Sequence, residues 1–181
     1  MEAIENKTDA GKRHVRIFLV LSQSEDTDTV KYAVSALANL AGFPPAALLI
    51  AEGEGEGLKK LVGLLRLGLP EIVHPTAHTI AALTGRKDGT LVTGEWYPPE
   101  DKAREWAKAL LGHGLLPPLL LLSSSLPQSS PPHHLVGVAL ENLRAWWGTP
   151  LSAAEAVSLT TSPDCSPALN AWMTMRDDDQ V

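Results

Sequence analysis

Cysteine is almost absent from this chain. Of the 181 residues only Cys165 is a cysteine, which excludes an internal disulfide and a metal cluster built on cysteine ligands. Long apolar runs are also missing, because the longest, residues 115–122, contains two prolines and is too short to cross a bilayer. Residues 1–14 lack the apolar segment of a signal peptide. We therefore expect a soluble, cytoplasmic protein that has no membrane partner.

Concentrated positive charge is lacking as well. The chain has 15 lysines and arginines against 21 acidic residues, and its formal net charge is −6. The basic residues are scattered, so we do not expect duplex nucleic acid as a partner. Hydrophobic residues make up 44%, which is enough for one core. We expect a flexible N-terminal segment over 1–13, a single domain over 14–158 and a C-terminal tail over 159–181.

Short apolar runs alternate with segments of helical periodicity. The runs that we interpret as strands cover residues 14–22, 46–51, 71–74, 90–96 and 118–122. Helices are predicted between them, because apolar residues recur at three- and four-residue spacing. Val30, Val34, Leu37 and Ala41 are one example. The other predicted helices cover residues 58–65, 76–84, 98–114, 133–147 and 149–157.

This alternation of strand and helix predicts an α/β fold. Buried strands joined by helices are typical of a mostly parallel sheet covered on both faces. We expect a three-layer, Rossmann-like sandwich with four or five strands. In such folds ligands bind at the carboxyl ends of the strands, which directs attention to the polar loops that follow each run.

Two of these loops are rich in serine. Ser22 and Ser24 precede the first predicted helix, and Ser123 and Ser124 follow the last predicted strand. Their hydroxyl groups are candidates for binding a phosphate. The alternative is structural: Asp26 or a neighbour simply caps the helix, and the later serines form a plain connection. No phosphate-loop or serine-nucleophile motif surrounds them.

Histidines four residues apart offer a different chemistry. His74 precedes Pro75, which disfavours helical conformation, so we expect His74 to end a strand and His78 to begin the next helix. Each histidine is a candidate acid–base residue. Zinc proteases also use this spacing, but the glutamate of their motif is missing here. We therefore predict no metal site, and packing remains the alternative role for both histidines.

The basic pair Arg86 and Lys87 completes the candidate ligand-binding set, and we expect no cofactor. Together these residues indicate a protein that binds a nucleotide or other phosphorylated small molecule, with hydrolysis by a histidine as one outcome. The alternative is an assembly or regulatory subunit without catalysis, and whether the chain is an enzyme stays open. A homodimer is expected, with Trp147 in the core and Trp146 left for a partner subunit.

Overall fold

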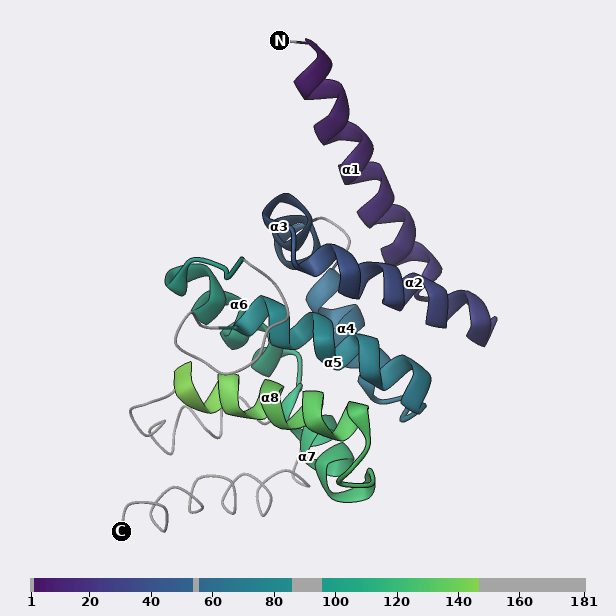
Figure 1. Cartoon of the computed structure of the whole chain (residues 1–181), viewed down its shortest axis with the longest axis vertical. Coiled ribbons are helices and arrows are strands. Elements are labelled where there is room, and N and C mark those ends of the chain that lie inside the picture. Colours follow the sequence, from purple (N-terminus) through teal and green to yellow (C-terminus); the bar gives the residue numbers. More distant parts are fainter. Residues whose placement is uncertain (1, 54–55, 86–95, 147–181) are drawn as a thin grey trace.

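All secondary structure in the described part of the chain is helical. The computed structural model describes residues 2–53, 56–85 and 96–146, and these form eight helices (Figure 1). The expected α/β sandwich with a parallel sheet is therefore wrong. The helices are α1 (Glu2–Leu21), α2 (Thr27–Ala41), α3 (Pro44–Glu52), α4 (Gly57–Leu65), α5 (Pro70–Thr84), α6 (Glu100–Gly112), α7 (Leu116–Ser125) and α8 (Pro131–Trp146).

Four of the five predicted strands are parts of helices. Residues 14–21 belong to α1, 46–51 to α3, 71–74 to α5 and 118–122 to α7, while the fifth run, except Trp96, lies outside the described residues. A short apolar run has the same appearance in a buried strand and in a buried helix. Residues 46–51 and 118–122 consist largely of alanine and leucine, which are strong helix formers. The helix propensity of these residues therefore favours a helix, although the lack of alternation between apolar and polar residues had indicated a buried strand.

Prolines begin several of these helices. Pro44, Pro70 and Pro117 occupy the first or second position of α3, α5 and α7. At that position the amide hydrogen has no partner within the helix, and the fixed φ of proline already suits helical backbone. Each of these prolines follows closely on the preceding helix, so short turns connect α2 to α3, α4 to α5 and α6 to α7.

The central element is α5. It contacts α2, α4, α6 and α8, and 11 of its 15 residues are buried. In Figure 1 it lies between α2 and α8. Its threonines keep their hydroxyl groups bonded inside the core, since Thr76 Oγ1 donates to the Ile72 carbonyl (2.6 Å) and Thr79 Oγ1 donates to the Pro75 carbonyl (2.9 Å). Because most of its positions are buried, α5 does not divide into an apolar face and a polar face.

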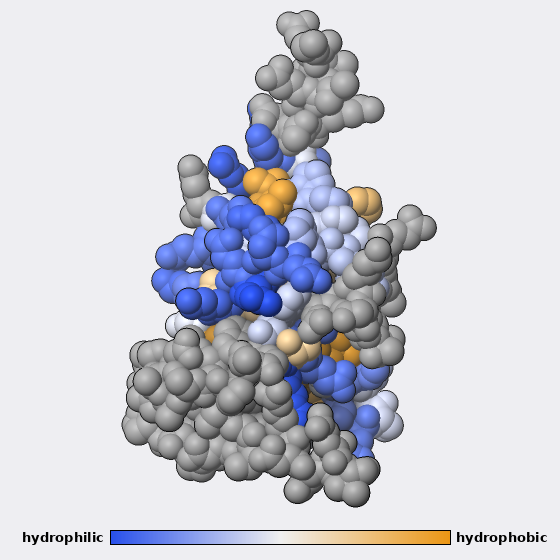
Figure 2. All heavy atoms as spheres, turned by 90° about the vertical axis from the view of Figure 1, so that its left-hand side faces the viewer, coloured by the Kyte–Doolittle hydropathy of each residue, from blue (hydrophilic) through white to orange (hydrophobic). Residues whose placement is uncertain are grey.

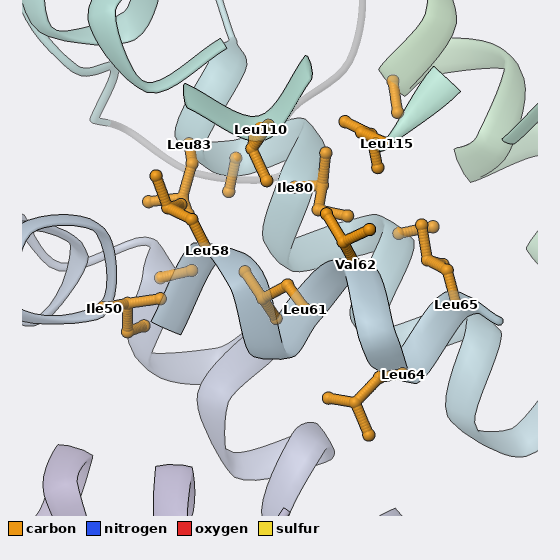
Figure 3. Close-up of a cluster of buried hydrophobic side chains, with 14 of the residues drawn as sticks. Ile50, Leu58, Leu61, Val62, Leu64, Leu65, Ile80, Leu83, Leu110 and Leu115 are labelled. Atoms are coloured by element: carbon orange, nitrogen blue, oxygen red, sulfur yellow. The ribbon is translucent and has the colours of Figure 1, made fainter. Parts of the chain in front are cut away.

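Leucine and isoleucine side chains from several helices meet around α4. Figure 3 shows Leu61 and Leu65 of α4 in a cluster with Ile80 of α5, Leu110 of α6 and residues from α3. These four named side chains are each at most 1% exposed. Side chains buried to this degree remove apolar surface from water, which is the main favourable contribution to folding. The core thus runs through the middle of the helical assembly.

Two buried hydrogen bonds join α5 to α8. Asn142 Nδ2 donates to the Ala81 carbonyl (3.1 Å), and Trp146 Nε1 donates to the Thr84 carbonyl (2.7 Å). From the first pair to the second, the residue number increases in both helices, so α5 and α8 run parallel. Trp146 is only 8% exposed. Our expectation that Trp146 is left for a partner subunit is therefore wrong, and Trp147 lies outside the described residues.

Candidate functional site

The candidate residues would share one site only at the rim of a parallel sheet. Strand ends that would gather them at one rim do not exist in residues 2–53, 56–85 and 96–146, where every element is a helix. The predicted binding and hydrolysis of a nucleotide or phosphorylated small molecule at strand-end loops is therefore wrong, together with the Rossmann-like description on which it rested. Each residue must be considered where the helices place it.

Ser22 and Ser24 lie in the turn between α1 and α2, where both hydroxyl groups serve the backbone. Ser22 is 2% exposed and its Oγ donates to the Leu19 carbonyl at 3.1 Å. Ser24 Oγ accepts from the Asp26 amide at 3.1 Å. Asp26 in turn accepts from the Thr29 amide at 2.9 Å and caps α2. The capping interpretation of Asp26 is confirmed, and hydrogen bonds from Thr29 lower the pKa of its carboxyl.

Ser123 and Ser124 belong to the last turn of α7. Ser124 Oγ donates to the Leu121 carbonyl at 2.9 Å within the same helix. Our expectation of a loop that follows a strand is wrong at this point, because the residues are helical. Arg86 and Lys87 lie outside the described residues. Binding of a ligand by any of these four residues stays a prediction.

His74 and His78 lie on one face of α5, because the helix continues through Pro75. Our expectation that His74 ends a strand is wrong. His74 is exposed and His78 is half-buried. Burial lowers the pKa of His78, and the neighbouring His74 lowers it further, which favours the neutral imidazole. Within the described residues no three metal-ligating side chains come together, and an acid–base role for either histidine stays a prediction.

A groove lies between the end of α4 and α7. Its volume is about 480 Å³, which is within the range of small-molecule sites. We refer to it as the α4–α7 groove. It is lined by Leu65, Arg66, Gly68, Pro117, Pro118, Leu121, Leu122, Ser125 and Leu126. Arg66 is the one charged residue in this lining, and its Nη2 donates to the His113 carbonyl at 3.5 Å. The groove offers an apolar wall but no acid–base pair.

The C-terminal half of α1 exposes aliphatic side chains. Val15 and Leu19 are 1% and 2% exposed and face the core, whereas Ile17, Val20 and Leu21 are 50%, 67% and 39% exposed. We call these last three residues the α1 surface. They lie within five consecutive positions at helical spacing, so they share one side of the helix. Contiguous exposed apolar side chains of this kind mark interaction sites more often than single ones do.

Sequence reasoning missed the α1 surface because we interpreted residues 14–22 as a buried strand. The signal was present in residues 17–21, all of which are apolar. A helix packed on one side only cannot bury five consecutive residues, so some of them must face outward. Figure 1 shows that α1 packs along one edge of the bundle and that its N-terminal end projects beyond it.

Another face of the molecule has a different character. Figure 2 looks at the side that carries α6, and hydrophilic residues cover most of its described part, with only small, separate hydrophobic groups. The outward residues of α6 account for much of this character, since Glu100, Asp101, Arg104, Glu105 and Lys108 are exposed. Scattered apolar residues on a charged face are ordinary for a protein surface. The α1 surface differs from this face, because its exposed residues are consecutive apolar positions on one side of a helix.

No family model, curated protein or solved structure matches this chain. In the part of the chain that the structure describes, no helix combines the length and the apolar character needed to span a bilayer.

Proposed function

We propose that this chain is an assembly subunit that forms a homodimer through the α1 surface. The observation that carries the proposal is the exposure of Ile17, Val20 and Leu21 on one side of a helix whose other side is buried. Two copies that pack these side chains against each other remove apolar area from water. A two-fold contact needs only one surface patch, since each copy presents the same residues to the other.

The expected affinity is modest. Full burial of an aliphatic side chain contributes about 1.5–3 kcal/mol, and the exposed fractions of these three residues sum to about one and a half side chains per copy. Two copies then gain about 5–9 kcal/mol from this contact. Loss of translational and rotational freedom opposes it by roughly 4–15 kcal/mol. Even the most favourable combination leaves a net gain of about 5 kcal/mol, so we expect a weak dimer with a dissociation constant of about 0.2 mM or higher.

Light scattering on the full chain tests the proposal. The mass is expected to rise from one copy towards two as the concentration increases from about 10 µM to 1 mM, a range that includes this weak affinity. Val20→Ser is expected to weaken association at least tenfold, because it removes the most exposed member of the α1 surface from both copies. Circular dichroism should show unchanged helicity, since Val20 makes little contact with the core.

Leu121→Ser is the matched control. Leu121 is 68% exposed, almost the same as Val20 at 67%, but it lies in the α4–α7 groove. If the chain associates through nonspecific hydrophobic contacts, both variants should weaken association to a similar extent. If Leu121→Ser dissociates the dimer and Val20→Ser does not, the groove is the interface and the proposal is wrong. Binding of the monomer to anionic lipid vesicles, lost in Val20→Ser, would likewise contradict it and identify α1 as a membrane-binding helix.

A further inference from the structure

Opposite charges flank the α1 surface at its two ends. Arg13 and Arg16 are exposed and lie one turn before Ile17 and Val20, so they extend the same side of the helix toward the N-terminus. Beyond the other end of α1, Glu25 and Asp26 are exposed in the turn that leads to α2. The surface therefore changes along its length from basic, through apolar, to acidic.

We infer that the two copies pack their α1 helices antiparallel, with Arg13 of each copy facing Glu25 of the second copy. This inference rests on the proposed homodimer and specifies its geometry. Within α1, facing residues of an antiparallel pair have numbers with a constant sum. The register that pairs Ile17 with Leu21 places the two-fold axis beside Leu19 and brings Arg13 of each copy about one helical turn past Leu21 of the second copy. The turn that carries Glu25 follows Leu21 at this end of α1, so the same register brings together the apolar side chains and the opposite charges.

A parallel pair would have the opposite electrostatics. It would place Arg13 against Arg13 and Glu25 against Glu25, and like charges in contact disfavour association. Within the part of the chain that the structure describes, neither Arg13 nor Glu25 takes part in an ion pair. Both groups can therefore pair across the interface without breaking an existing contact. Because such pairs lie at the exposed rim, they set orientation, and salt screens them.

Hydrogen bonds hold the end of α1 and the acidic turn in place. Lys60 Nζ of α4 donates to the Leu19 carbonyl at 3.2 Å, and Ser22 Oγ donates to the same carbonyl. Asp26 is held as the cap of α2. The acidic turn is thus attached at both ends, and Glu25 is presented at a defined place relative to the α1 surface.

Charge reversal in the full chain tests the orientation, with dissociation constants measured by analytical ultracentrifugation at low ionic strength. Arg13→Glu and Glu25→Arg are each expected to weaken the dimer about fivefold or more, because each replaces two attractive pairs with two repulsive ones. The double variant Arg13→Glu/Glu25→Arg is expected to return to within about twofold of the original, since the pairs are restored with reversed sign. Lys108→Glu on exposed α6 is the control for net charge.

The outcomes separate the two proposals. If the chain dimerises and Val20→Ser dissociates it, but the single reversals have no effect, the antiparallel register is wrong and the proposed function stands. A double variant that is weaker than either single variant also overturns the register. A chain that stays a monomer at every concentration overturns both.

Discussion

Trp106 connects α6 to α3 through one hydrogen bond, and a single substitution can remove this bond while it keeps most of the ring packing. Its side chain is 1% exposed, and its Nε1 donates to Glu52 Oε1 at 3.0 Å. Glu52 Oε1 also lies 2.8 Å from Lys102 Nζ. Trp106→Phe keeps an aromatic ring in the core, but it removes the indole donor and leaves a small cavity.

The expected loss of stability follows from these two changes. A hydrogen bond of this kind contributes about 0.5–1.5 kcal/mol, and the lost contacts and residual space cost about 1–2 kcal/mol more. We therefore expect Trp106→Phe to lower the free energy of unfolding by about 2–3 kcal/mol, with a fall in Tm of roughly 5–10 °C. Urea unfolding followed by circular dichroism measures both the midpoint and the slope.

Glu52→Gln is the matched control, because the amide oxygen can still accept from Trp106 while the ion pair with Lys102 is lost. The Glu52 and Lys102 side chains are 38% and 35% exposed, and an ion pair of that exposure contributes less than about 1 kcal/mol. If Trp106→Phe changes the free energy of unfolding by less than about 0.5 kcal/mol, or if Glu52→Gln costs as much as Trp106→Phe, the indole hydrogen bond and ring packing do not stabilise the contact between α6 and α3. A cycle with Glu52→Ala should give a coupling of about 0.5–1.5 kcal/mol.

Three further outcomes are expected. The hydrogen bond from Lys102 is the main cause that lowers the pKa of Glu52. The stabilisation by the Glu52 carboxylate is therefore present at neutral pH and is lost as the pH falls through this lowered pKa. When unfolding is measured from pH 7 to 3, the stability of Glu52→Gln should decline less steeply than that of the original chain. Gly57→Ala should destabilise the fold by at least about 2 kcal/mol, because the new Cβ would collide with the Ile50 carbonyl oxygen. In Gly63→Ala, in the same helix, the new Cβ meets nothing within 4 Å, so this variant should be more stable by about 0.5–1 kcal/mol. Equal changes in Tm for the two variants would contradict this. Asp26→Ala should cost about 0.5–2 kcal/mol through loss of the α2 cap, and a neutral result in urea unfolding would show that the cap is dispensable.

Helices with one polar face were predictable from the sequence. The spacing of Val30, Val34 and Leu37 predicted α2, and all three residues are buried in it. The stripes in α4, α6 and α8 were informative for the same reason, since each of these helices has a buried and an exposed side. The capping of α2 by Asp26 was also predictable, because capping depends on local geometry alone.

The elements that were predicted wrongly depend on tertiary contacts. In α5 most positions are buried, so no stripe distinguishes the helix from a buried strand. Pro75 suggested a boundary between His74 and His78, yet α5 continues through it, because packing against four neighbouring helices outweighs the local preference of one proline. The α1 surface was missed because exposure is decided by which neighbours a helix has.

The parallel pairing of α5 and α8 has a consequence for how the chain is made. Ala81 and Asn142 are 61 positions apart, and α6 and α7 lie between them. During synthesis one side of α5 stays uncovered until α8 emerges from the ribosome, so termination before Pro131 would leave apolar side chains of α5 exposed to water. We therefore expect such fragments to aggregate more readily than the full chain.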